Sequence, residues 1–301
     1  MPLLRTLESI RTSWLDTFMT FATRLGEEMI LIVFFCALFW CISKRHAYVI
    51  GAVFFLSSLV VQGLKIIFRV PRPWVYDPTF EIVGEAYGAA TGYSFPSGHT
   101  QNAAAWLGSV GAMVKKWWVK VICFGLAGLV AFTRLYLGVH YLQDVVVSLV
   151  ITFAIVWLAM KFIPAEATCI KREALIAGVI VLCAGVVIVV AAVLYHGDIS
   201  ETHQLRDATR AAGAALAFAL GMFIERNYVK FDPRTKKLWM QPVKLIIGIG
   251  VTLGLQEGLR VMGSGLFPDA LRYFFMVFWI VGVYPMVIKK FFQPTEQENQ
   301  S

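Results

Sequence analysis

Nine long apolar stretches, separated by short polar turns, limit the fold of this chain more than any other feature of its sequence. They lie near residues 29–43, 47–64, 100–114, 117–133, 143–160, 174–195, 211–224, 243–262 and 271–288. A helix that crosses the hydrocarbon core of a bilayer needs about 20 apolar residues, so 29–43 and 211–224 are the weakest candidates for a crossing. The pattern predicts an all-α fold, a polytopic bundle of membrane helices.

The composition excludes the other broad classes of protein. Hydrophobic residues make up 58% of the 301 residues, charged residues make up 15%, and the mean hydropathy is +0.69. A soluble domain carries about 25% charged residues, so this chain has too little polar surface to coat a globule of its size. The same apolar content excludes a disordered chain. The five cysteines form no Cys-x-x-Cys pair, which argues against zinc and dithiol chemistry.

The basic residues predict how the helices are oriented. The chain has 27 lysines and arginines against 19 acidic residues. In a membrane protein such an excess usually marks cytoplasmic loops rather than a nucleic-acid site. If the turn at 43–46 is cytoplasmic, 16 of the 27 basic residues lie on that side. This arrangement places the N-terminus outside the cell and the C-terminus in the cytoplasm.

Residues 1–25 show the pattern of an amphipathic helix. Apolar side chains recur at helical spacing, with charges on the other face: Leu3, Leu7, Ile10, Trp14, Phe18, Phe21 and Leu25. Such a helix lies in the membrane interface or packs on the protein's own surface, and the pattern fits both. Further along, the polar stretch 196–210 marks a loose division of the chain. There His203, Arg206 and Arg210 share one helical face, which we interpret as a solvated surface.

The first polar motif follows the second apolar stretch and consists of Lys65 and, after six residues, Arg72-Pro73. Lys65 and Arg72 are seven residues apart, about two helical turns, so they lie near one face. Pro71 and Pro73 end the helix there. Taken alone, two cations at a membrane boundary are typical of contacts with lipid headgroups.

The second motif, Pro96-Ser97-Gly98-His99, opens the third apolar stretch. Gly98 permits close approach to the backbone, and the free N–H groups of a helix start bind anions. Ser97 adds a hydroxyl, and His99 adds a proton that is exchanged near neutral pH. A plain helix start, capped by Ser97, is the alternative interpretation.

The third motif places Arg134, His140 and Asp144 ahead of the fifth apolar stretch. His140 and Asp144 are four residues apart and are therefore neighbours on one helix face. A carboxylate there holds one ring nitrogen protonated and leaves the other free to attack. Asp144 would otherwise be an uncompensated charge at the head of an apolar run, which points to function.

All three motifs fall on the same side of the membrane in the predicted orientation. Three cations around a helix N-terminus suit a multiply charged anion such as phosphate. The two histidines supply a nucleophile and an acid. The sequence therefore predicts one pocket that binds and attacks a phosphate group.

In this order and spacing the motifs resemble those of the type-2 phosphatidic acid phosphatase superfamily, over roughly residues 25–160. Thr133 departs from the family pattern, which often has Ser there, but it keeps the hydroxyl. The resemblance implies a six-helix catalytic core followed by about three extra C-terminal transmembrane helices. We therefore expect an interfacial helix over 1–25, a catalytic membrane domain over 26–196 and C-terminal transmembrane helices over 197–301.

The resemblance also implies the chemistry and the role of each residue. His140 attacks phosphorus and forms a phosphohistidine, Asp144 orients His140, and His99 protonates the leaving oxygen before activating water. The phosphate oxygens are held by Lys65, Arg72, Ser97, Gly98 and Arg134. The implied enzyme is a lipid phosphatase of the plasma membrane, active at the outer face, without metal or cofactor.

Several alternatives stay open on the sequence alone. The substrate is undecaprenyl diphosphate, phosphatidylglycerophosphate, phosphatidate or, as in glucose-6-phosphatase, a soluble phosphate ester. The same phosphohistidine would serve a lipid phosphotransferase. A transporter or lipid-binding protein that retains the pocket is a third class. Glu257 and Arg260 in the eighth stretch favour it only weakly, because they are three positions apart on a helix and can simply pair with each other. Oligomeric state is not predicted.

Overall fold

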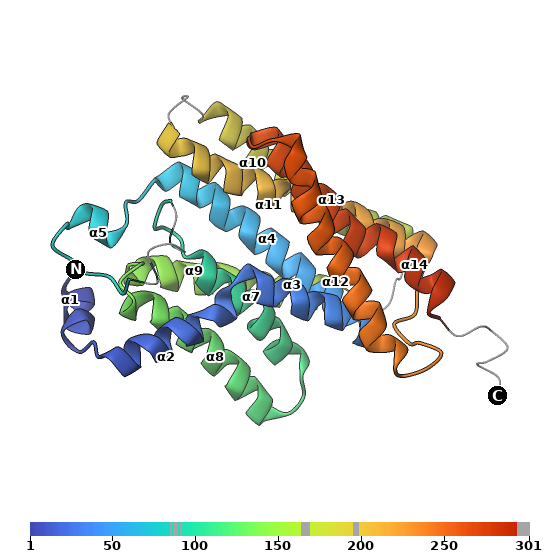
Figure 1. The fold of residues 1–301 in the computed structure, drawn as a ribbon, viewed down its shortest axis with the longest axis horizontal. Coiled ribbons are helices and arrows are strands. Elements are labelled where there is room, and N and C mark those ends of the chain that lie inside the picture. The colour runs from blue at the N-terminus through green and yellow to red at the C-terminus, as the bar shows by residue number, and fades with distance from the viewer. Residues whose placement is uncertain (85, 87–89, 91, 164–168, 195–198, 294–301) are drawn as a thin grey trace.

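The computed structural model describes residues 1–84, 86, 90, 92–163, 169–194 and 199–293. Every regular element within this part of the chain is a helix, which confirms the predicted all-α membrane bundle (Figure 1). The helices are α1 (Pro2–Ser9), α2 (Ser13–Thr23), α3 (Glu28–Ala37), α4 (Lys44–Phe68), α5 (Pro73–Tyr76), α7 (Gly98–Met113), α8 (Trp117–Tyr136), α9 (Leu142–Phe162), α10 (Ile170–Val193), α11 (Ile199–Ile224), α12 (Met240–Gly258), α13 (Leu266–Phe278) and α14 (Tyr284–Phe291).

Seven helical segments of the described chain are long and apolar enough to cross a membrane. Two of the predicted stretches fall outside this set. Helix α7 has 16 residues, about 24 Å at the rise of an α-helix. Helix α3 reaches the length of a crossing only together with α2, from which it is bent by 49°. Other helices pack against α7 on several sides, so protein rather than lipid surrounds much of it.

Helix α4 is the central element of the bundle. Every residue from 47 to 55 is buried, so all faces of this part of the helix are covered. A helix that is apolar all round belongs in the interior, and α4 indeed packs against α7, α9, α10 and α11. Lys65 lies near its C-terminal end. The most enclosed helix therefore carries the first cation of the predicted pocket.

Helix α11 joins the last helices to the rest of the bundle, since it contacts α4, α10 and α13 (Figure 1). Small buried side chains line it, among them Ala208, Ala212, Ala215 and Ala219. A Cβ atom at Gly213 would lie 2.3 Å from the carbonyl oxygen of Ala270 on α13. Such residues let helix backbones approach closely, and this packing fixes α13 against α11.

Only part of the polar face of α11 is the solvated surface that the sequence suggested: His203 is exposed, whereas Arg206 and Arg210 are partly buried in ion pairs. Nε of Arg206 lies 2.6 Å from Oδ2 of Asp269, and Nη2 of Arg210 lies 2.7 Å from the same oxygen. Arg272 binds the other carboxylate oxygen at 3.0 Å. The carboxylate partner, Asp269, lies on α13, so the local sequence of α11 could not predict these ion pairs. These ion pairs fasten the ends of α11 and α13 together.

The N-terminal segment forms two helices rather than one, with a break between α1 and α2. Leu4 and Leu7 are buried against Phe80 and the ends of α8 and α9. Trp14 and Phe21 stay largely exposed. The apolar stripe is therefore divided between the protein's own surface and an outward face, and the contact of that face with the membrane interface stays a prediction.

Candidate active site

The three predicted motifs meet at one end of the helical core. Lys65 is in the last turn of α4, and Arg72 directly precedes α5. Ser97 caps α7, and Arg134 is in the last turn of α8. Asp144 is in the first turn of α9, with His140 just before it. Five different segments thus bring their polar ends together, and the apolar remainder of each helix stays in the bundle.

His140 and Asp144 form a buried pair. His140 is 2% exposed and Asp144 is fully buried. Nδ1 of His140 lies 3.3 Å from Oδ2 of Asp144. The same oxygen accepts hydrogen bonds from the backbone N–H of Tyr141, at 2.9 Å, and from the hydroxyl of Ser94. Within the described residues the second oxygen, Oδ1, has no hydrogen-bond partner. All the polar contacts of this carboxylate therefore converge on the atom that faces His140.

The other ring nitrogen of His140 identifies the tautomer. Nη1 of Arg72 lies 3.1 Å from Nε2 of His140. A guanidinium group can only donate, so Nε2 accepts and the proton is on Nδ1, facing Asp144. Burial, together with the cations of Arg72 and Arg134, holds the pKa of His140 well below its ordinary value of 6.5. The ring is therefore neutral at neutral pH, and Nε2 carries an unprotonated lone pair that faces the guanidinium of Arg72.

Three cations act electrostatically on the His140 ring, and all are buried: Lys65 is 7% exposed, Arg72 5% and Arg134 1%. Backbone carbonyls fix the first two. Nζ of Lys65 donates to the carbonyl of Tyr93 and Nε of Arg72 to that of Gly92, both at 2.9 Å. Buried charge is costly unless it is compensated. The pocket therefore has a surplus of positive charge that a bound anion would balance.

Arg134 is held differently. Its Nη1 donates to the hydroxyl of Thr23 on α2, at 2.8 Å. Its Nε has no hydrogen-bond partner within the described residues. No carboxylate of the described chain forms an ion pair with this guanidinium. Arg134 thus keeps a buried donor for a ligand.

At the start of α7, Ser97 caps the helix and Gly98 faces open space. The Ser97 hydroxyl accepts hydrogen bonds from the N–H of Thr100, at 3.4 Å, and from its hydroxyl, at 3.0 Å. Its backbone N–H donates to the carbonyl of Asp144, at 3.2 Å, which ties α7 to α9. Ser97 is therefore a capping residue, as the alternative interpretation expected, and its hydroxyl proton remains for a ligand. A Cβ atom on Gly98 would meet nothing within 4 Å, so the first turn faces free space.

His99 lies beside a cavity of about 390 Å³ that Gly98 also lines. Within the described residues its ring makes no hydrogen bond. The ring is thus available for proton transfer on the side of the pocket that faces this cavity. His140 does not line the cavity, so of the two histidines only His99 faces this space.

Two polar contacts of the site were not predicted from the sequence. Ser94 is buried, donates to Asp144, and lies 3.4 Å from Nδ1 of His140. Thr23 holds Arg134. Sequence analysis placed neither residue in a motif, because a single serine or threonine in a polar or amphipathic segment carries no signal of its own.

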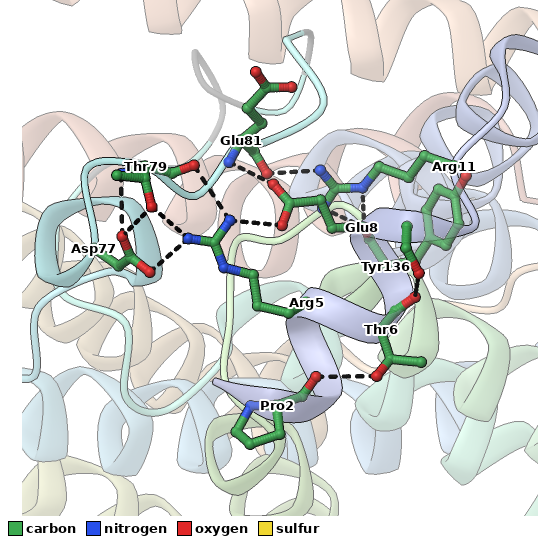
Figure 2. Close-up of polar contacts among 10 residues, drawn as sticks. Pro2, Arg5, Thr6, Glu8, Arg11, Asp77, Thr79, Glu81 and Tyr136 are labelled. Atoms are coloured by element: carbon green, nitrogen blue, oxygen red, sulfur yellow. Dashed lines mark hydrogen bonds and ion pairs between the residues drawn. The ribbon is translucent and has the colours of Figure 1, made fainter.

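The first helix fixes the loop that follows α5 (Figure 2). Arg5 forms ion pairs with Glu8 on its own helix, at 2.9 Å, and with Asp77 in the loop, at 2.7 Å. Glu8 accepts the backbone N–H of Glu81 at 2.8 Å. Arg11 donates to the carbonyl of Glu81 at 2.6 Å and to a backbone carbonyl of α8 at 2.9 Å. The chain that leads from α5 to the second motif is therefore anchored to both α1 and α8.

Comparison with known proteins finds matches over both parts of the bundle. A model of the PAP2 superfamily matches residues 46–167, and a model of the transmembrane extension of PAP2 superfamily phosphatases matches residues 209–296. The undecaprenyl-diphosphatase BcrC of Bacillus subtilis is 30% identical over 156 residues, which are 51% of this chain and 78% of that protein.

Two solved structures are also similar. LpxE of Aquifex aeolicus is 27% identical, with a TM-score of 0.49, over 54% of this chain and 94% of the other. A PAP2-type phosphatidylglycerolphosphate phosphatase of Bacillus subtilis is 26% identical, with a TM-score of 0.45, over 54% of this chain and 82% of the other.

Proposed function

The chain belongs to the PAP2 superfamily of membrane phosphatases, and from this premise we propose that it hydrolyses a lipid phosphate or diphosphate through a phosphohistidine. One observation carries the proposal. His140 has its proton on Nδ1 toward Asp144, so that Nε2 is unprotonated and lies among three buried cations. A neutral imidazole nitrogen with an orienting carboxylate is an activated nucleophile. The similar protein BcrC is an undecaprenyl-diphosphatase by its name.

The reaction proceeds in two displacements. In the first, Nε2 of His140 forms a bond to phosphorus while the bond to the leaving oxygen breaks, and His99 gives that oxygen a proton. In the second, a water molecule loses a proton to His99 and attacks the phosphohistidine. The bond to Nε2 breaks, inorganic phosphate leaves, and both histidines return to their starting protonation states.

The cations stabilise the charge that develops on the phosphoryl oxygens. Lys65, Arg72 and Arg134 are already buried and held by hydrogen bonds, so little reorganisation accompanies the reaction. The N–H of Gly98 and the hydroxyl of Ser97 add donors at the helix start. Preorganised donors of this kind contribute about 3 kcal/mol each to the transition state.

Release of inorganic phosphate by the purified protein tests the function. In detergent micelles we expect phosphate from at least one of undecaprenyl diphosphate, phosphatidylglycerophosphate and phosphatidate, with the His140→Ala variant as the blank. A soluble ester is included in the panel. Absence of phosphate release from every substrate would overturn the proposal, and transfer of the phosphoryl group to a lipid hydroxyl would identify a phosphotransferase instead.

Chelation provides a test of metal independence. Lys65, Arg72 and Arg134 supply the positive charge that a metal ion supplies in other phosphatases. We therefore expect activity in excess EDTA to stay within about twofold of the untreated enzyme. Vanadate should inhibit, because it adopts the geometry of the phosphoryl transition state. Loss of activity in EDTA that Mg²⁺ restores would contradict this mechanism.

Thiol labelling tests the proposed sidedness, with the active site at the outer face of the plasma membrane. Ser94 is unsuitable as a reporter because it is buried. Gly84 is exposed, and a Cβ atom there meets nothing within 4 Å. In a cysteine-free background, Gly84→Cys should react with an impermeant thiol reagent on intact cells, whereas Lys237→Cys in the turn before α12 should not. The opposite pattern would place the chemistry at the cytoplasmic leaflet.

A further inference from the structure

The cavity beside His99 lies between the catalytic helices and the C-terminal extension. Helices α4 and α7 form one wall, the start of α3 adds Glu27 and Glu28, and α11 and α13 close the other side with Asp207 and Tyr273. Its volume of about 390 Å³ is within the range of sites that bind small molecules or the headgroups of larger ones. The extension therefore completes a chamber that the catalytic core alone would leave open.

The position of the chamber identifies which part of a substrate would enter it. In a phosphoryl displacement the nucleophile and the leaving oxygen are roughly in line, on opposite sides of phosphorus. His140 does not line the chamber, whereas His99 and Gly98 do. With His140 as the nucleophile and His99 as the acid, the leaving group extends from the phosphate into this space.

The walls of the chamber are rich in hydrogen-bond acceptors. Glu27, Glu28 and Asp207 are carboxylates, and Gln62 and Asn102 are amides. Within the described residues the side chains of Glu27 and Glu28 make no hydrogen bond and no ion pair. Acceptor groups of this kind bind hydroxyl donors and repel an anion.

The one arginine among the described residues that line the chamber, Arg210, is already paired with carboxylates. Arg210 lies 2.9 Å from Asp207 and 2.7 Å from the buried carboxylate of Asp269. It therefore offers little attraction to a second phosphate group. The net charge of the chamber walls in the described chain stays negative, in contrast to the cationic phosphate site next to them.

A second cavity continues from the chamber into the apolar interior. It is smaller, about 40 Å³, and five residues line both spaces: Glu28, Phe54, Phe55, Ala214 and Tyr273. Beyond these shared residues its walls are apolar residues of α3, α4, α13 and the turn that follows α13. The sequence of environments, from cationic to polar to apolar, matches a phosphate ester, its hydroxylated carbon backbone and the beginning of a hydrocarbon chain.

Resting on the phosphatase function proposed above, we propose that this chamber receives the leaving group of the substrate and selects an uncharged, hydroxylated lipid moiety over a second phosphate group. Helices α11 and α13 act through Asp207 and Tyr273 as part of the specificity pocket. A monoester of a glycerol lipid leaves an uncharged alcohol in the chamber. A lipid diphosphate would instead leave a phosphate group among three carboxylates.

Competition between two substrates tests this selection. The pair is a lysophosphatidate, whose leaving group is a neutral monoacylglycerol, and a prenyl diphosphate of similar chain length, both in the same detergent micelles. We expect wild-type kcat/KM to be at least about tenfold higher for the lysophosphatidate. The double variant Glu27→Gln, Glu28→Gln should reduce that ratio by about tenfold, chiefly through KM. Asp207→Asn should change it in the same direction.

The design separates specificity from folding and from catalysis. A ratio of two substrates is independent of the amount of folded enzyme in a preparation. The matched control is Glu257→Gln on α12, whose carboxylate forms an exposed ion pair with Arg260 at 2.7 Å and does not line the chamber. That variant should keep the wild-type ratio. An unchanged ratio in the chamber variants, or a wild-type preference for the diphosphate, would overturn the inference alone. Absence of phosphate release from both substrates and from the whole panel named above would overturn the proposed function as well.

Discussion

Replacement of His140 by alanine is expected to abolish turnover, with a loss on the order of 10⁵-fold or more, and to abolish any phosphoenzyme. The substitution removes Nε2, the nitrogen that forms the bond to phosphorus in the proposed first step. No other residue of the proposed site is placed to act as the nucleophile. Quenching the enzyme and its ³²P-labelled substrate in alkaline detergent retains the phosphoenzyme. Subsequent release of the label by acid identifies the adduct as phosphohistidine, which is labile to acid and stable to base.

The same experiment on His99→Ala gives a different expected result. With an aryl phosphate the leaving group needs little proton assistance, so the phosphoenzyme should still form. Its breakdown should be slow, since no base remains to activate water. A labelled phosphoenzyme in His140→Ala, or its absence in His99→Ala with the aryl substrate, would show that the two roles are exchanged.

Asp144→Asn is expected to lower kcat by roughly 10²- to 10³-fold while the protein stays folded. The three donors around Asp144 all point to Oδ2, and Oδ1 has no partner in the described chain. An asparagine can therefore place its carbonyl oxygen where Oδ2 was and keep the tautomer of His140. What it removes is the negative charge that stabilises the ring as it becomes positively charged.

Two further variants bracket that result. Ser94→Ala removes one donor to the carboxylate and keeps its charge, so we expect a loss of only about tenfold. Asp144→Ala removes the orienting contact as well and should cost more than Asp144→Asn. Equal activity of Asp144→Asn and wild type in single-turnover phosphoenzyme formation would show that the charge of Asp144 has no part in the first step.

Within the predicted site, the detailed geometry that the sequence could report is that of residues close along the chain. His140 and Asp144 are one helical turn apart, and the Ser97 cap precedes its own helix, so spacing along the chain reports their geometry. Ser94 contacts a carboxylate 50 residues away, and Thr23 contacts an arginine 111 residues away. Such contacts depend on how helices pack, and a single hydroxyl residue does not encode that packing.

The fold shows the same division between local and long-range information. Apolar runs predicted the long helices from α3 onward, because membrane solvation acts on each segment separately. Arg206 and Arg210 were interpreted as solvated because their partner, Asp269, lies on another helix. The break between α1 and α2 was missed for a similar reason. Arg11 there turns inward to backbone carbonyls of residues far along the chain.

The surplus of positive charge around Nε2 of His140 has a consequence for the enzyme at rest. Lys65, Arg72 and Arg134 repel one another in a buried space, so the empty pocket is a source of instability in the fold. Inorganic phosphate, the reaction product, relieves that repulsion. A ligand at a hundred times its dissociation constant stabilises a protein by about 2.7 kcal/mol. Binding of phosphate to this pocket therefore both inhibits the enzyme and stabilises its fold. A phosphate buffer should raise the melting temperature of the enzyme and lower its turnover rate.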